Sequence, residues 1–247
     1  MRRLWPDPGP IDDLPSLVAA APRPTPADRP WLLVNMIVAL DGSVTVEGRS
    51  GGLARPADKA MFSALRAVGD VVLAGAGTVR AEHYGPPRPG EEVRATRRSR
   101  GQAEAPRIAI ATRSLDLDLT WPLFTEAEQP PFLLVCEATP RDRRKAAAEV
   151  AELIVTGHDT VDLAAAMAEL HERGARTVTC EGGPHLNGDL LLADLIDEWA
   201  LTLSPLLTGG DARRATTGPL PPAPREMHLD SILEGDGLLL TRWLRDR

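Results

Sequence analysis

The sequence predicts an α/β fold with a mostly parallel central sheet, helices on both faces and an antiparallel hairpin at the carboxyl end. Three observations support this prediction. Short apolar segments rich in β-branched residues alternate with segments of helical periodicity, which is the pattern of strand-helix-strand units. Two of these short segments end in glycine turns that lead directly into helices. The last two apolar segments flank Gly235-Asp236-Gly237, which is typical of a hairpin.

The composition indicates a globular chain of 247 residues, of which 43% are hydrophobic and 26% are charged. A chain of this length can bury a substantial core. The net charge of -7 argues against general binding to nucleic acid or anionic membranes, which needs a basic surface. Cys136 and Cys180 lie in apolar segments without CxxC or metal-ligand spacing, so we expect buried, reduced thiols in a cytoplasmic protein.

The first 29 residues are rich in proline, with a short helix expected near residues 11–21. We expect residues 1–29 to form an arm that is laid over the domain or partly disordered. Residues 30–247 are then expected to form one domain. The longest apolar run, residues 31–40, is too short to span a bilayer.

Residues 31–40 are nearly all apolar, as expected of a strand that is covered on both faces. The strand ends at Asp41-Gly42. A carboxylate at the carboxyl end of a buried strand is where open α/β sheets place their sites. An aspartate at this position equally suits a plain turn, in which it binds its own backbone.

Residues 56–68 have apolar side chains at helical spacing and predict an amphipathic helix. A strand at residues 70–74 then leads into a glycine turn and a helix start at residues 75–82. Residues 84–106 break all periodicity and carry four closely spaced arginines, which are Arg94, Arg97, Arg98 and Arg100. We expect this segment to be a solvated, mobile loop or a basic clamp over an anionic ligand.

The second half of the chain continues the alternation of strands and helices. Strands are expected at residues 107–111, 132–136, 152–155, 177–180, 199–203, 227–233 and 238–244. Helices are expected at residues 141–151 and 161–173, and after the glycines at 182 and 183. Parallel strands joined by helices place their carboxyl ends along one edge of the sheet.

The turn at Gly182-Gly183 joins an apolar strand to a helix. Glycine allows the backbone to approach a ligand closely, and the N–H groups of a helix start attract phosphate oxygens. A similar turn at residues 75–82 indicates a second set of donors, although such glycines also occur for turn geometry alone. Neither G-x-G-x-x-G nor G-x-x-x-x-G-K-[ST] is present.

The polar residues at the predicted strand ends indicate a binding site for a nucleotide cofactor. They are Asp41, Thr78, Arg80, Thr112, Arg113 and Glu181. The five histidines show no ligand spacing, so no metal site is predicted. No G-x-S-x-G motif for nucleophilic catalysis occurs.

Five separated motifs resemble the RibD C-terminal family, the pyrimidine reductases of riboflavin biosynthesis, which have the dihydrofolate reductase fold. The motifs lie at residues 35–42, 65–70, 77–82, 181–184 and 205–210, in the family's order and spacing. The resemblance covers roughly residues 30–244. It implies an NADPH-dependent reduction of 5-amino-6-(5-phosphoribosylamino)uracil or a close analogue, by hydride transfer to ribose C1′.

The resemblance also implies roles for individual residues. The cofactor is expected to contact Gly52, Thr78, Arg80, Glu82, Thr112, Arg113, Gly182, Gly183, Pro184, His185, Leu186 and Asn187. The hydroxyl and guanidinium at Thr112 and Arg113 suit the adenosine 2′-phosphate. The substrate is expected to contact Asn35, Ser50, Arg66, Arg88 and Glu181, of which Arg66 equally suits an exposed helix surface. Asp41 is the candidate acid for catalysis.

Two departures from the family pattern leave alternatives open. The deaminase signatures H-x-E and P-C-x-x-C are missing, so the chain is expected to catalyse only the reduction. Asn35 stands where many bacterial members have a lysine, which leaves the exact substrate open. The alternatives are a dihydrofolate or other pterin reductase on the same fold and a non-catalytic NADPH-binding regulatory protein. The resemblance further implies a homodimer.

Overall fold

The computed structural model describes residues 1–246, which fold around a single mixed sheet of eleven strands. The strand order across the sheet is β2-β1-β10-β11-β9-β3-β8-β4-β5-β6-β7. The strands are β1 (Arg2–Trp5), β2 (Gly9–Pro10), β3 (Trp31–Ala39), β4 (Val71–Gly75), β5 (Arg107–Ala111), β6 (Phe132–Val135), β7 (Glu152–Val155), β8 (Thr177–Cys180), β9 (Glu198–Ser204), β10 (His228–Gly235) and β11 (Leu238–Leu244). The helices are α1 (Leu14–Ala20), α2 (Pro56–Val68), α3 (Ala76–Ala81), α4 (Glu91–Ser99), α5 (Pro122–Thr125), α6 (Arg141–Ala147), α7 (Leu163–Glu172) and α8 (Pro184–Leu192).

The sheet is parallel from β9 to β7 and antiparallel from β9 to β2, so the predicted α/β class with a terminal hairpin is confirmed. Strand β3 lies between β8 and β9, and its first four residues are fully covered. A strand with both faces covered is mostly apolar, and this strand is apolar except for Asn35. Its central place explains why the longest apolar run of the chain is a strand.

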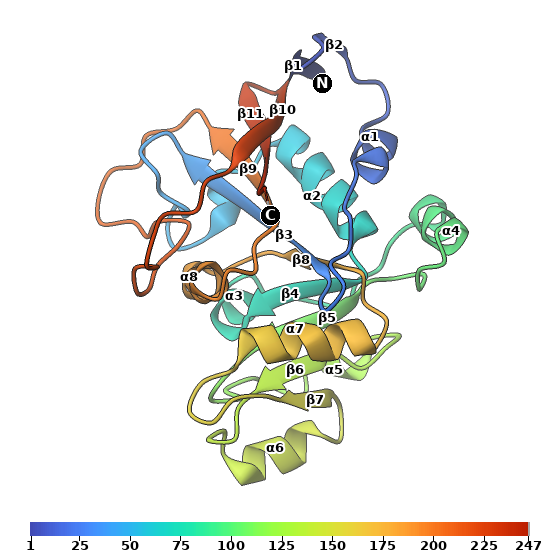
Figure 1. Cartoon of the computed structure of the whole chain (residues 1–247), viewed down its shortest axis with the longest axis vertical. Helices are drawn as coiled ribbons and strands as arrows, with labels where there is room; N and C mark the ends of the chain where they lie inside the picture. Colours follow the sequence, from blue (N-terminus) through green and yellow to red (C-terminus); the bar gives the residue numbers. More distant parts are fainter. Residues whose placement is uncertain (247) are drawn as a thin grey trace.

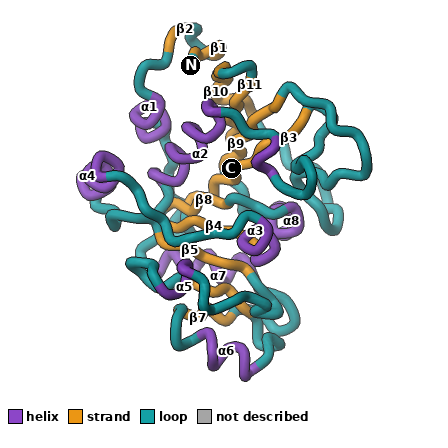
Figure 2. Tube along the Cα trace, turned by 180° about the vertical axis from the view of Figure 1, so that it is seen from behind, coloured by secondary structure: helices purple, strands orange, loops and turns teal. Residues whose placement is uncertain are grey.

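Helices cover both faces of the parallel half of the sheet (Figure 1). Helices α7 and α8 pack on one face, and the shorter α3 and α5 pack on the other, which Figure 2 shows from behind. The antiparallel half is covered by α1 and α2, whose apolar sides meet β9, β10 and β11. The core is therefore divided between three clusters, separated by the sheet and by its change of strand direction.

The first residues of the chain belong to the same sheet. Strand β1 pairs with β10, and α1 packs against α2 through Leu14 and Val18. Arg23 then donates two hydrogen bonds to the buried carboxylate of Glu198, at 2.9 and 3.0 Å. The segment expected as an arm is thus attached to the domain by a strand, a helix and a buried ion pair.

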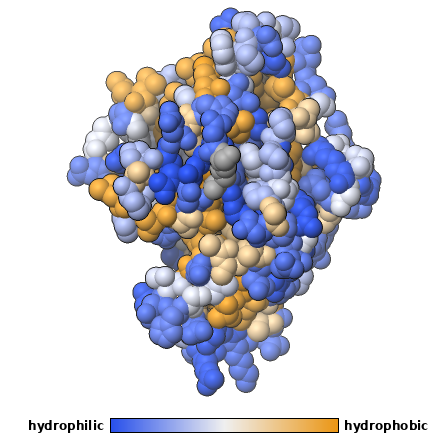
Figure 3. All heavy atoms as spheres, in the orientation of Figure 1, coloured by the Kyte–Doolittle hydropathy of each residue, from blue (hydrophilic) through white to orange (hydrophobic). Residues whose placement is uncertain are grey.

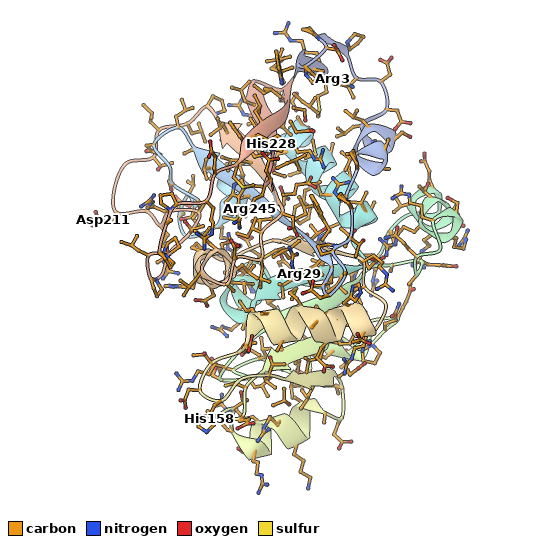
Figure 4. All side chains as sticks on the ribbon, in the orientation of Figure 1. Arg3, Arg29, His158, Asp211, His228 and Arg245 are labelled. Atoms are coloured by element: carbon orange, nitrogen blue, oxygen red, sulfur yellow. The ribbon has the colours of Figure 1, made fainter. Side chains whose placement is uncertain are left out.

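Arg29 makes a second buried ion pair just before β3. Its guanidinium donates to both carboxylate oxygens of Asp197, at 2.6 and 2.7 Å. Figure 4 shows Arg29 in the middle of the molecule, whereas His158 and Asp211 lie on outer loops. Asp197 also accepts from the N–H of Leu32, so the pair aligns the start of β3 with the start of β9.

The prediction of a mobile loop or basic clamp at residues 84–106 was wrong, because residues 91–99 form helix α4. Arg97 is buried and donates to the carbonyl oxygens of Ala67, Gly69 and Ala103. The other arginines of the helix pair with glutamates around it, such as Arg94 with Glu104. A helix held by a buried arginine and by ion pairs has no apolar periodicity, which is why the sequence pattern concealed it.

Smaller differences concern lengths and short elements. The helix expected at residues 141–151 ends at residue 147, where the chain turns toward β7. Strands β1 and β2 and the single turn of α5 were not predicted. These are short elements whose pairing depends on residues far along the chain.

Candidate active site

A cavity of about 630 Å³ opens at the carboxyl ends of β3, β4 and β8. Met36 and Ile37 line it from β3, Gly75 from the end of β4, and Glu181 from the residue after β8. Helices α2 and α3 and the start of α8 form its other walls. This is the edge at which open parallel sheets bind ligands.

The two predicted glycine turns meet in the wall of this cavity. The carbonyl oxygen of Gly182, at φ +79°, accepts from the N–H of Gly75 at 2.8 Å. A Cβ added at Gly183 would lie 2.8 Å from Oγ1 of Thr78, so only glycine fits there without displacement. The peptide between Gly182 and Gly183 is cis.

This turn has the donor set of a diphosphate site. Helix α8 has nine residues and begins at Pro184 without a side-chain cap, so the N–H groups of His185 and Leu186 have no acceptor within the helix. Thr78 adds a hydroxyl from α3. The close packing and the donors fit the backbone approach that a dinucleotide requires.

Asn187 supports the turn from behind. It is fully buried, donates to the carbonyl oxygen of Ala215 at 2.9 Å and accepts from the Cys180 thiol at 3.6 Å. Burial raises the pKa of the Cys180 thiol to about 12, so this thiol stays protonated. Gly188 packs against the backbone of Thr217, where a Cβ would lie 2.2 Å from the carbonyl oxygen.

The opposite half of the cavity contains a buried carboxylate, Glu181, with two donors. Arg66 from α2 donates to both of its oxygens, at 2.5 and 2.7 Å, and the Tyr84 hydroxyl donates at 2.6 Å. The Arg66 guanidinium also lies over the Phe62 ring, 4.4 Å from its centre. The two residues predicted to contact the substrate from α2 and β8 therefore form one ion pair.

Burial and charge together determine the pKa values here. Burial alone lowers the pKa of Arg66, but the bonds and charge of Glu181 outweigh it, so the net pKa of Arg66 is raised. Burial, followed by the Glu181 charge, raises the pKa of Tyr84 well above its ordinary value. Arg66 is therefore charged and Tyr84 neutral near neutral pH.

Ser50 and Glu82 connect the two halves of the cavity. The N–H and hydroxyl of Ser50 both donate to Oε1 of Glu82, at 3.0 and 2.9 Å. Both residues line the cavity, as do Asn35, Pro184, His185 and Leu186. His185 is exposed at the cavity rim.

The structure does not bring Asp41 into this cavity. Its carboxylate accepts from the N–H groups of Thr208 and Gly209, at 2.6 and 2.7 Å, and faces a separate hollow beside β9. These backbone bonds lower the pKa of Asp41, which suits a turn carboxylate and not a proton donor. The alternative of a structural turn aspartate agrees with this geometry.

Other predicted contacts lie outside the cavity wall. Arg88 is exposed and pairs with Glu126, and Arg80 donates to the carbonyl oxygen of Asp116 at 2.7 Å. Gly52 is exposed beside Val46. Arg88, Arg80 and Gly52 therefore do not line the cavity.

Thr112 and Arg113 follow β5, whose last residue is in register with Gly75 of β4. They therefore lie at the same sheet edge as the glycine turns, one strand further out. Thr112 is buried, and its hydroxyl accepts from the N–H of Leu115 at 3.0 Å, whereas Arg113 is exposed.

Several lining residues were missed by the sequence analysis, notably Asp58, Phe62, His83, Tyr84 and Arg213. Two of them, Asp58 and Phe62, could have been predicted from their spacing. They precede Arg66 at intervals of four residues in one helix, so the three side chains share a face. No comparable signal marks the others, which reach the cavity from loops.

Comparisons with known proteins agree with this fold. The family model of the RibD C-terminal domain matches residues 30–238. A 2,5-diamino-6-ribosylamino-4(3H)-pyrimidinone 5′-phosphate reductase from Archaeoglobus fulgidus is 28% identical over 183 residues, which cover 74% of this chain and 83% of that protein. The match to RibD of Escherichia coli, at 26% identity, covers 77% of this chain and 52% of that protein.

Solved structures show the same fold. A pyrimidine reductase-like protein from Corynebacterium diphtheriae has a TM-score of 0.82 and 24% identity, covering 94% of this chain and 98% of that one. Dihydrofolate reductase from Enterococcus faecalis has a TM-score of 0.52 and 12% identity, covering 88% and 97%. The predicted dihydrofolate reductase-like fold is confirmed. Since the family model matches well over half of the chain, from residue 30 to residue 238, the chain belongs to the RibD C-terminal domain family.

Proposed function

We propose that this protein is a reductase that uses a nicotinamide cofactor to reduce a 5′-phosphorylated ribosylaminopyrimidine. The observation that carries the proposal is one cavity with two unlike halves. One half consists of glycine turns and the uncapped start of α8, and the other of the Arg66–Glu181 pair. The Archaeoglobus relative, a pyrimidinone phosphate reductase, supports the substrate class.

The Arg66–Glu181 pair favours a ligand that carries both an anion and N–H donors. Each charge neutralises the other in the free protein, and the carboxylate side chain is only 2% exposed. A ligand that binds only one of the two leaves the other buried without a partner, which is costly. A phosphorylated aminopyrimidine offers a phosphate to Arg66 and ring N–H groups to Glu181, so it compensates both.

The bound nicotinamide supplies the hydride, and the chain's residues orient the substrate and exclude water. Phe62 and Tyr84 flank the Arg66 guanidinium, at 4.4 and 5.3 Å from their ring centres, and keep it in one direction. The Ser50–Glu82 contact ties the loop after β3 to α3, so the rim of the cavity is held on both sides.

We infer further that the cofactor is NADPH and that Arg113 contacts its 2′-phosphate. Arg113 is exposed at the sheet edge beside the glycine turns, where a dianion extending from the diphosphate site would meet it. A guanidinium suits a phosphate through paired N–H donors. The buried Thr112 hydroxyl orders the turn that carries Arg113.

The test is oxidation of NADPH and of NADH by the purified protein, followed by absorbance. Three acceptors are compared, which are 5-amino-6-(5-phosphoribosylamino)uracil, its 2,5-diaminopyrimidinone analogue and dihydrofolate. Turnover of either pyrimidine supports the proposal. Turnover of dihydrofolate alone would indicate a pterin reductase, and binding of NADPH without any turnover would indicate a regulatory protein.

The protein is also proposed to form a homodimer. Apolar side chains gather on the side of the molecule that carries β3, β9 and the loops after them (Figure 3). Leu40 and Leu207 are 61% and 79% exposed there, and the backbones of Leu40 and Leu206 are hydrogen-bonded at 2.9 Å.

Within residues 1–246, no helix is long and apolar enough to cross a membrane.

A further inference from the structure

The cavity wall formed by α2 carries a carboxyl group that the preceding account does not use. Asp58, Phe62 and Arg66 recur at intervals of four residues, so they lie on one face of the helix. All three line the cavity. Asp58 is therefore in the same half of the site as the Arg66–Glu181 pair, one helical turn beyond Phe62.

Asp58 differs from the other carboxylates of the cavity in its partners. Glu181 is held by Arg66 and Tyr84, and Glu82 accepts from the N–H and hydroxyl of Ser50. The partner of Asp58 is the neutral hydroxyl of Thr202 on β9. Burial raises the pKa of Asp58, and the Thr202 bond lowers it by less, so the net pKa is above the ordinary value.

The charged groups around Asp58 are engaged elsewhere or lie on other walls. On its own helix, Lys59 is exposed and Arg55 donates to the carbonyl oxygen of Asp236 at 2.5 Å. Arg66, on the same helix, donates to both carboxylate oxygens of Glu181. The groups on the other walls of the cavity are Glu82, His83, Glu181, His185 and Arg213. Among residues 1–246, none of these groups is a cation that pairs with Asp58. Asp58 therefore keeps its proton more readily than an aspartate in a salt bridge does.

The proposed reaction requires one proton besides the hydride. In the substrate, ribose C1′ is bonded to the ring oxygen and to the exocyclic nitrogen. The C1′–oxygen bond breaks with its electron pair on oxygen, and the nitrogen lone pair forms a C1′=N bond. The hydride then forms a C–H bond at C1′, and the π pair returns to nitrogen. The ring oxygen becomes a hydroxyl, so it must receive the proton.

We propose that Asp58 is the catalytic acid that protonates the ribose ring oxygen as the C1′–oxygen bond breaks. This proposal rests on the proposed function. The carboxyl group lies in the substrate half, on the helix face that carries Arg66, and it is half-buried within an open cavity through which solvent returns the proton. A positioned acid of this kind accelerates such a step by about 10²–10⁴-fold.

The other candidates for this role are less well placed. Asp41 faces a separate hollow and accepts from the backbone. The Tyr84 hydroxyl already donates a hydrogen bond to Glu181. His185 belongs to the start of α8 in the cofactor half, and His83 is stacked on Trp121 with the ring centres 6.3 Å apart.

The first test is Asp58→Asn, which preserves the size of the side chain and a hydrogen bond to Thr202. We expect kcat with the phosphoribosylaminopyrimidine to fall about 100-fold or more. The KM for the pyrimidine and the Kd for NADPH should change less than about threefold, since the group is not a binding contact. Asp142→Asn, in the first turn of α6 and exposed, is the matched control and should leave kcat unchanged.

The second test is the pH profile of kcat. The protonated carboxyl is the active form, so kcat of the wild-type protein should fall as pH rises through the pKa of Asp58. The Asp58→Asn variant should lose this limb, and Asp58→Glu should restore part of the rate together with it. A retained limb in Asp58→Asn would assign the proton to another group.

A third readout is independent of turnover. Carboxyl ¹³C NMR titration of the wild-type protein and of Asp58→Asn identifies the Asp58 resonance by difference. A midpoint above the ordinary value of about 3.9 supports the proposal, and a midpoint at or below it overturns the proposal.

The outcomes separate this proposal from the proposed function. If the wild-type protein reduces the pyrimidine and Asp58→Asn stays within about threefold of its kcat, Asp58 is not the acid and the function stands. If Asp58→Asn raises KM with kcat intact, Asp58 binds substrate and the proposal is overturned. If the wild-type protein reduces neither pyrimidine, the proposed function itself fails, whatever the NMR titration gives.

Discussion

The Arg66 guanidinium and the Tyr84 hydroxyl donate three hydrogen bonds to the Glu181 carboxylate in the free protein. Substrate must therefore exchange these bonds for its own. Exchange within a buried site is selective, because an imperfect ligand leaves a charge without a partner. Selectivity for a phosphorylated pyrimidine then follows from a pair of residues and needs no large apolar contact.

At Arg113, the choice between NADPH and NADH can be tested directly. Arg113→Ala should weaken NADPH binding by about 1.5–3 kcal/mol, the scale of hydrogen bonds to charged groups, and leave NADH binding nearly unchanged. Fluorescence titration of both cofactors measures the two dissociation constants. Arg143→Ala serves as the control, since Arg143 donates to the Ser114 carbonyl oxygen nearby. Equal losses for both cofactors would remove Arg113 from the 2′-phosphate site.

At the residue scale, two of the residues expected at strand ends line the cavity, whereas residues that reach the cavity from loops were not predicted. Glu181 and Thr78 follow apolar strands that the sequence pattern reveals, and both line the cavity. Tyr84 comes from a loop whose path is set by distant contacts, so nothing local marks it. Asp41 met the strand-end criterion, but its strand β3 extends further along the edge, so its carboxylate reaches the loop after β9 instead.

Elements were predicted best where one periodicity covers their whole length. The strands at residues 107–111 and 177–180 and the helix at residues 56–68 have the expected bounds. Helix α4 was missed because polar contacts stabilise it, and β1 was missed because its partner β10 lies far along the chain. Local patterns carry no information about such pairing.

The glycine turn before α8 allows an element-scale prediction. Gly183→Ala places a Cβ 2.8 Å from Oγ1 of Thr78, so the two turns must move apart. Overpacking of this kind costs about 1–3 kcal/mol, and NADPH binding should weaken about tenfold. Titration with NADPH and urea unfolding measure the two effects. Gly90→Ala, with no neighbour within 4 Å of the added Cβ, should alter neither. An unchanged Kd in Gly183→Ala would mean that the turn does not hold the cofactor.

The buried carboxylate of Glu198 attaches the N-terminal segment to β9 and β11 and should make stability depend on pH. Burial raises its pKa, but Arg23 and Arg242 outweigh burial, so the folded pKa lies below the ordinary 4.5. A lowered pKa stabilises the folded state above the unfolded value, and this contribution is lost as pH falls through the folded value.

Urea unfolding at a series of pH values between about 7 and 3 should therefore show a falling free energy below the ordinary glutamate pKa. Arg23→Gln removes one of the two cations and should shift this loss to higher pH. Arg2→Gln, whose partner Glu234 is more exposed, is the matched control and should leave the profile unchanged. Identical profiles for Arg23→Gln and wild type would show that Glu198 does not depend on Arg23.

At the scale of the whole molecule, the change from parallel to antiparallel pairing at β9 separates the cavity from the terminal strands. The parallel half supplies strand ends and helix starts to the site. In the antiparallel half, α1 and the strands pack against the apolar side of α2. This packing holds in place the face of α2 that carries Asp58 and Arg66. The N-terminal segment thus contributes to the site through packing, without a residue of its own in the cavity wall.

The side of the sheet opposite α2 provides the last test, because large exposed apolar side chains mark interfaces. Leu207 is 79% exposed beside Leu40, and a hollow lined by Trp199 and Leu201 lies next to these loops. We expect sedimentation equilibrium to show a dimer and Leu207→Glu to convert it to monomer, since a buried carboxylate without a partner opposes association. Leu220→Glu, at a leucine that is 91% exposed in the Pro-rich loop, is the control for added charge. A wild-type monomer, or a dimer unaffected by Leu207→Glu, would place any contact between copies on another face.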